Sequence, residues 1–88
     1  SSAPATANKM EVQTLAGAHK VQIQLARPQV VVLFAERMSD GEILATFIKS
    51  GMNPGAYEVD LNLEKLKNQG IALRWRIGEA PVQDLMIQ

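Results

Sequence analysis

Apolar and polar side chains alternate with a period of two along most of this chain, which is the spacing of half-buried β-strands. Val21, Ile23 and Leu25 alternate with polar residues, so residues 20–25 place aliphatic side chains on one face and polar side chains on the other. Residues 9–15 predict an earlier strand, and residues 16–19 (Ala-Gly-Ala-His) predict the turn between the two.

Arg27-Pro28 ends this strand, because proline has no N–H to donate to a neighbouring strand. Residues 29–37 then form a strand that is apolar on both faces, which is typical of a central strand covered on both sides. Its two faces carry Val31, Leu33 and Ala35 on one side and Val30, Val32 and Phe34 on the other. A second layer of the fold covers one face, and a partner can cover the other.

Ser39-Asp40-Gly41 predicts a tight hairpin turn, because Asp-Gly readily adopts the positive backbone angles that such a turn needs. Residues 42–49 are expected to return as a strand, and residues 50–55, with two glycines and a proline, to form a loop. Residues 57–63 alternate again and predict a further amphipathic strand.

Residues 62–68 change period and predict a short helical turn. Asn62 can cap it, Leu61 can pack on Leu66, and Gly70 can end it in a left-handed conformation. Residues 71–77 then form a strand with Trp75 inward and Arg74 and Arg76 outward, and residues 82–87 form the last strand after a turn. About seven short strands at this spacing predict an all-β fold, a small antiparallel β-sandwich.

The chain has 88 residues, room for one hydrophobic core, and nine basic and nine acidic side chains that cancel. Residues 1–8 are small and uncharged and are expected to be a flexible linker before a single domain at residues 9–88. Zero net charge argues against a nucleic-acid partner. Because cysteine is absent, disulfides, thiolate chemistry and Cys-based zinc sites are excluded. The longest apolar run, Val30–Ala35, is far shorter than the roughly 20 residues that cross a bilayer, so membrane insertion is not expected.

Few residues suggest catalysis or a cofactor. His19, the single histidine, is expected in an exposed turn. Glu58 and Asp60 are two apart on one strand, roughly 7 Å by strand rise, but a solvated face explains this acidic pair without a glycosidase site. Asp40 and Glu42 could join them around a calcium ion, although no sequential Asp-x-Asp loop is present. No enzyme activity and no cofactor is therefore expected.

A surface is a stronger candidate than a catalytic site. Val31, Leu33 and Ala35, with Leu44 or Ala45 on the next strand and Met86 in the last, can form an apolar patch that binds a partner. Alternatively, these side chains face the second layer of the sandwich and are internal. Trp75 lies between Leu73 and Ile77 and is expected in the core, whereas Arg74 and Arg76 can pair with Glu58 or Asp60 across strands.

The order of these features resembles a known family. A strand at residues 30–34 passes through the Gly41 turn, a Pro-Gly-x-Tyr segment (residues 54–57) leads an alternating strand, and a leucine-rich turn ends at Gly70 before the closing hairpin. This pattern is similar to the Ig-like C-terminal domains that direct bacterial proteins through the type IX secretion system. It is also similar to the Ig-like domain of the flagellar hook-capping protein. The resemblance covers roughly residues 20–88.

The resemblance implies an Ig-like β-sandwich that serves as a non-catalytic sorting domain in the bacterial cell envelope or on secreted proteins. The outer-membrane export machinery is then its protein partner, and the segment from residue 74 onward, with Arg74, Arg76, Asp84 and Met86, is expected to be read by it. The alternative is an accessory binding, assembly or adhesion module that forms a homodimer or adds a strand to a partner.

Overall fold

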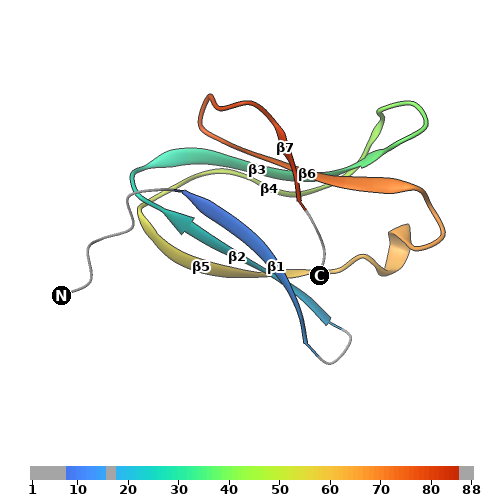
Figure 1. The fold of residues 1–88 in the computed structure, drawn as a ribbon, viewed down its shortest axis with the longest axis horizontal. Coiled ribbons are helices and arrows are strands. Elements are labelled where there is room, and N and C mark those ends of the chain that lie inside the picture. Colours follow the sequence, from blue (N-terminus) through green and yellow to red (C-terminus); the bar gives the residue numbers. More distant parts are fainter. Residues whose placement is uncertain (1–7, 16–17, 86–88) are drawn as a thin grey trace.

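The computed structural model describes residues 8–15 and 18–85, which form seven strands and one 3₁₀ turn in two layers (Figure 1). The elements are β1 (Lys9–Leu15), β2 (Ala18–Leu25), β3 (Gln29–Arg37), β4 (Ile43–Met52), β5 (Gly55–Leu61), η1 (Glu64–Leu66), β6 (Ile71–Ile77) and β7 (Gln83–Asp84). All strand pairs are antiparallel.

The strands divide into a three-stranded sheet of order β1-β2-β5 and a four-stranded sheet of order β4-β3-β6-β7. The chain crosses from one sheet to the other after β2, after β4 and after β5. Two antiparallel sheets with these crossings make an Ig-like β-sandwich. The predicted fold class is therefore confirmed.

The core lies between the sheets and follows the alternation of the sequence. The three-stranded sheet contributes the buried side chains of Met10, Val12, Val21, Ile23, Leu25 and Leu61, and the four-stranded sheet contributes those of Val31, Leu33, Ala35, Ile48, Leu73 and Ile77. Burying a large aliphatic side chain stabilises the fold by roughly 1.5–3 kcal/mol. Among the described residues no polar or charged side chain is buried, so these apolar contacts hold the two layers together.

The two faces of β3 differ sharply. Val31, Leu33 and Ala35 are fully buried, so the expectation that they form an exposed patch is wrong and the internal alternative holds. The reason lies in the pairing with β6, which sets these three residues opposite Ile77, Trp75 and Leu73. Residues directly opposite in an antiparallel pair share a face, so all six point into the sandwich.

The hairpin between β3 and β4 forms at the predicted turn. Gly41 has φ of 76°, and its N–H donates to the carbonyl oxygen of Arg37 at 2.8 Å. The predicted loop at residues 50–55 is wrong, because β4 continues to Met52, which pairs with Gln29 at the start of β3. The connection to β5 is therefore only Asn53 and Pro54.

The helical turn forms where predicted, but its N-cap residue is Leu63, which makes no side-chain cap hydrogen bond, and the turn ends differently. The Asn62 Oδ1 atom accepts a hydrogen bond from the Glu64 N–H at 3.0 Å, and Leu66 is buried. The left-handed residue is Asn68, with φ of 74°, rather than Gly70. Asparagine tolerates this conformation better than most residues.

Two further expectations concern the last strand and the N-terminal linker. The predicted last strand at residues 82–87 is described only at Gln83–Asp84, and Met86 lies outside the described residues. Residues 1–7 of the predicted linker also lie outside them. Asn8 accepts a hydrogen bond on Oδ1 from the Ala26 N–H at 3.0 Å, which ties it to the end of β2.

Candidate recognition surface

The outer face of the four-stranded sheet carries an apolar stripe with basic borders. We define the outer stripe as Val30, Val32, Phe34 and Ile43. On either side of β3, Val32 pairs with Lys49 and Arg76, and Phe34 pairs with Thr46 and Arg74. Val30 and Ile43 are 54% and 56% exposed. The stripe therefore presents apolar side chains to solvent between cationic ones.

No other described strand covers this face, because the opposite face of the same sheet packs on the three-stranded sheet. Val32 and Phe34 are only half-buried, by their neighbours within the sheet. Scattered single apolar residues are normal on a protein surface, but contiguous ones commonly mark an interaction site. β3 thus has an exposed apolar face, but it is the face opposite to the one that was expected to bind a partner.

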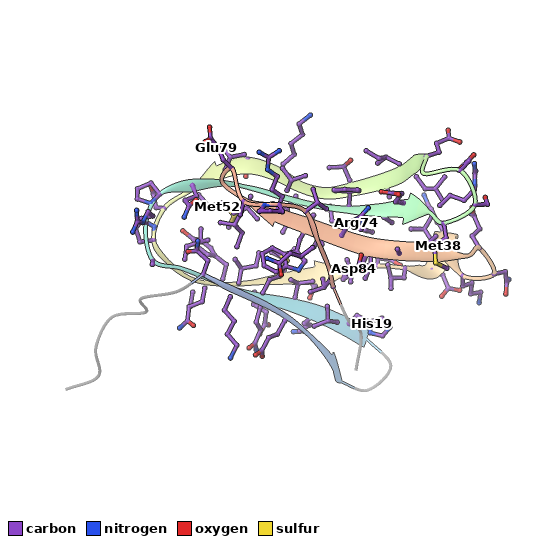
Figure 2. The ribbon with its side chains drawn as sticks, turned by 45° about the horizontal axis from the view of Figure 1, so that its top comes forward. His19, Met38, Met52, Arg74, Glu79 and Asp84 are labelled. Atoms are coloured by element: carbon purple, nitrogen blue, oxygen red, sulfur yellow. The ribbon has the colours of Figure 1, made fainter. Side chains whose placement is uncertain are left out.

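Arg74 lies at the centre of an ion-pair cluster on this face. Its Nη1 atom is 3.5 Å from Glu36 Oε2, and its Nε atom is 3.3 Å from Asp84 Oδ1. The Nε atom is shielded from solvent and makes no well-directed hydrogen bond despite the nearby carboxylate. The cluster joins β3, β6 and β7, and Figure 2 shows Arg74 and Asp84 on the two neighbouring strands.

The predicted pairing of Arg74 and Arg76 with Glu58 or Asp60 is wrong. Those carboxylates lie on the outer face of the other sheet, where Lys20 Nζ is 3.2 Å from Glu58 Oε1 and 3.9 Å from Asp60 Oδ1. The hydrogen bond to Glu58, together with the charges of both carboxylates, raises the pKa of Lys20. Glu58 and Asp60 therefore form ion pairs with Lys20.

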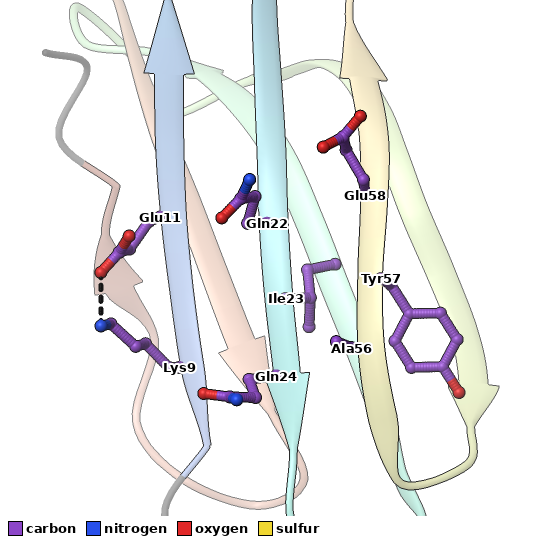
Figure 3. Close-up of a pocket in the computed structure, with 8 residues that line it drawn as sticks. All are labelled: Lys9, Glu11, Gln22, Ile23, Gln24, Ala56, Tyr57 and Glu58. Carbon is purple, nitrogen blue, oxygen red and sulfur yellow. Dashed lines mark ion pairs between the residues drawn. The ribbon is translucent and has the colours of Figure 1, made fainter. Parts of the chain in front are cut away.

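The outer face of the three-stranded sheet is polar and slightly hollowed. An open concavity of about 360 Å³ runs over β1, β2 and β5 (Figure 3). Its lining is Lys9, Glu11, Gln22, Ile23, Gln24, Ala56, Tyr57 and Glu58. Lys9 and Glu11 pair with each other at 2.7 Å, and Glu58 pairs with Lys20. This surface offers amides and paired charges rather than an enclosed site.

His19 does not lie in the predicted turn. It belongs to β2, opposite Leu61, and is half-buried, in the other sheet from Arg74 and Asp84 (Figure 2). An open depression of about 630 Å³ lies at the end of the three-stranded sheet. Its lining includes His19, Lys20, Asp60 and Glu64. The charges here again pair among themselves, because Lys67 Nζ is 2.8 Å from Glu64 Oε1.

The hairpin between β3 and β4 holds a third charged cluster. Arg37 Nη1 is 2.9 Å from Asp40 Oδ2 and 2.7 Å from Glu42 Oε2. A hydrogen bond from the Glu42 backbone N–H to Asp40 lowers the pKa of that carboxyl, and Arg37 lowers it further. The four acidic residues considered for calcium are therefore split between two clusters. Among residues 8–15 and 18–85 there is no group of three acidic or histidine side chains that could hold a metal ion.

The side chain of Trp75 lies on the face that the sequence predicts. Trp75 lies on the inner face of β6 and packs against the core, but it is half-buried rather than a fully buried core residue. Within the described part of the chain, no helix is long and apolar enough to span a membrane.

The outer stripe was missed because both faces of β3 are apolar, so the sequence of this strand alone does not show which face points into the core. The signal that identifies the faces lies in β6, where Arg74 and Arg76 cannot both point into an apolar core. This signal identifies the outer face of β3 only once β3 and β6 are known to be neighbours.

Comparison with known proteins gives no relative: no family model, no curated protein and no solved structure matches the chain.

Proposed function

We propose that this chain is a non-catalytic recognition domain that binds a protein partner through the outer stripe. The single observation that carries the proposal is the apolar row of β3, which none of the described strands covers and which Lys49 and Arg76 border. Buried apolar area supplies affinity at such a surface, and charge at its rim supplies orientation and partner choice. The matching partner surface carries apolar side chains with acidic ones at its border.

The specific role proposed is that of a sorting domain read by the type IX outer-membrane export machinery in the bacterial cell envelope. An Ig-like sandwich of seven strands is compatible with this role. On this proposal the outer stripe, together with Arg74, Arg76 and Asp84, is the surface that the machinery reads.

An export assay tests this role. The chain is fused behind a periplasmic reporter in a bacterium that has the type IX system, and surface reporter is measured. A double variant, Val32→Lys with Phe34→Lys, places two charges in the outer stripe. The matched control, Gln24→Lys with Ala56→Lys, places two charges on the outer face of the other sheet, where both residues are exposed and paired. Circular dichroism establishes that each variant folds.

We expect the unmodified fusion and the control to reach the surface and the stripe variant to stay in the periplasm. A folded, unmodified fusion that stays in the periplasm contradicts the sorting role. Export of the stripe variant at the unmodified level contradicts the assignment of the surface.

A second candidate is an assembly module in which two copies pair through this same face. The observation that favours it is the mixed charge of the face, because Glu36 and Asp84 lie beside Arg74, and Lys49 and Arg76 are nearby. A two-fold contact can then set opposite charges against each other. Sedimentation tests it with Phe34→Lys, since Leu33 is core and its replacement by lysine would disrupt the fold. A concentration-independent monomer contradicts this candidate.

A further inference from the structure

We propose that the free edge of β5 is a second binding site, which takes an extended peptide with alternating basic and apolar residues as an added strand. This site is separate from the outer stripe and does not depend on the function proposed for it. The sandwich has four sheet edges, formed by β1, β5, β4 and β7. The backbone favours β5 and β1, which both pair with β2 without a shift in register, over β4 and β7. The inner side chains and the outer charges then favour β5 over β1.

The backbone of β5 is suited to strand addition. It pairs with β2 over its whole length, from Gly55 to Leu61, without a shift in register. Alternate residues therefore direct N–H and C=O groups away from β2, in a row that a further strand can pair with. In contrast, the register of β4 shifts at two places, and such irregularities disrupt the pairing of an edge. The last strand, β7, has only two residues.

The flank of the sandwich beside β5 is incompletely covered. Several inward-facing side chains there pack on the core but remain partly exposed: Leu44, Phe47 and Met52 of β4, and Tyr57 and Val59 of β5. The two strands lie on the same flank because only Asn53 and Pro54 join them. On the opposite flank, Met10 and Val12 of β1 are only 8% and 4% exposed. An added strand at β5 can place apolar side chains over the open flank.

Tyr57 marks this open side. Figure 3 shows its ring on the side of β5 that faces away from β2. Its hydroxyl donates to the carbonyl oxygen of Asn53 at 2.6 Å, which holds the ring beside the edge. An apolar residue of an incoming strand therefore meets a fixed aromatic side chain.

The outer face of β5 is acidic. Glu58 and Asp60 share one cation, Lys20, and the Asp60 side chain is 88% exposed at 3.9 Å from it. Opposite charges on neighbouring strands attract, so lysine or arginine is favoured beside these two positions. A second copy of β5 is disfavoured, because an antiparallel pairing centred on Glu58 would set this carboxylate against itself. The occupant is therefore a strand whose basic residues lie beside Glu58 and Asp60 and whose apolar residues lie beside Tyr57 and Val59.

A defined peptide tests the site. The probe alternates lysine with valine over seven residues, the length of β5. One control peptide has the same composition in two blocks, a second has glutamate in place of lysine, and a third has N-methyl groups on alternate amides. Each is titrated into the ¹⁵N-labelled chain, and affinity and amide exchange are followed by NMR.

We expect the alternating lysine peptide to bind and to protect β5 amides, and each control peptide to bind about tenfold more weakly or not at all. Glu58→Lys with Asp60→Lys should reverse the preference between the lysine and glutamate peptides. Glu79→Lys, in the turn after β6, should not change it. Val32→Lys with Phe34→Lys should leave peptide binding intact, which separates this site from the proposed recognition surface.

Three results overturn the proposal. The first is no binding of the lysine peptide. The second is equal binding of the blocked or N-methylated peptide, which would indicate charge attraction without strand pairing. The third is protection of β1 or β4 amides in place of β5.

Discussion

Phe34 of β3 lies directly opposite Arg74 of β6 on the outer face of the four-stranded sheet. One residue earlier, Leu33 lies opposite Trp75 on the inner face and is fully buried. A register shift of a single residue between these strands would exchange the two environments. The composition of the outer stripe is therefore set by the pairing of β3 with β6.

Because of this pairing, truncating Leu33 and truncating Phe34 should lower the free energy of unfolding by different amounts. Leu33→Ala should lower the free energy of unfolding by about 2–5 kcal/mol, because it empties a fully buried site. Phe34→Ala should lower it less, by about 1–2 kcal/mol, because that side chain is only partly buried. Urea unfolding of both variants measures the difference. Equal costs, or a larger cost for Phe34→Ala, would mean that β3 faces the core with the other parity.

The sequence was sufficient for much of the fold because most strands alternate. β3 was predicted at residues 29–37 and β6 at residues 71–77, the bounds found in the structure. The turn at Gly41 was predicted because its backbone conformation suits glycine. These features depend on residues close together in the chain.

The remaining features depend on partners distant in the chain. β4 continues through Ser50, Gly51 and Met52 because β3 lies beside them, although glycine and serine there suggest a loop. His19 lies in a strand because β1 and β5 flank it. The exposed apolar face of β3 was predicted to be the one with Val31, Leu33 and Ala35, which is buried, because the order of strands was unknown.

The ion pairs of Arg74 should contribute modestly to stability and unequally between its partners. A double-mutant cycle of Arg74→Ala and Glu36→Ala should give a coupling of about 0.5–1 kcal/mol, since the Glu36 side chain is only 24% exposed. The cycle with Asp84→Ala should give less, because that side chain is 70% exposed.

Urea unfolding at low and high salt measures both couplings, and salt should weaken them. The exposed pair of Lys9 and Glu11 is the control and should couple weakly. A larger coupling for Asp84 than for Glu36 would contradict this order.

Gly78 should be intolerant of a side chain. Its φ of 63° favours glycine, its N–H donates to the Val30 carbonyl oxygen at 2.8 Å, and a Cβ atom there would collide with the Gln29 side chain. Gly78→Ala should therefore lower the free energy of unfolding by roughly 1–2 kcal/mol.

Gly51→Ala is the matched control, because a Cβ atom there meets open space. Adding Gln29→Ala to Gly78→Ala should recover the part of the cost that comes from the collision. Thermal unfolding compares the three variants, and an equal loss at both glycines would count against a special role for Gly78.

Asp40 should contribute to stability at neutral pH but not in acid. The Glu42 N–H, and then Arg37, lower its folded pKa below the usual 3.8. A group whose pKa is lowered on folding stabilises the fold above its unfolded pKa, and this stabilisation is lost as the pH falls through the folded pKa.

Asp40→Asn should therefore lower the urea midpoint at about pH 6, and its effect should shrink as the pH falls below the usual pKa of 3.8. Unfolding curves across this range test the sign. A difference that grows as the pH falls would contradict it.

Site-specific photo-cross-linking in exporting cells tests the central claim most directly. A photoreactive residue is placed at Phe34 on the outer stripe, and in a separate fusion at Gln24 on the other sheet. We predict a cross-link from position 34 to a component of the outer-membrane export machinery and none from position 24. Export of the reporter with cross-links from position 24 alone would contradict the claim that this domain is recognised through the outer stripe.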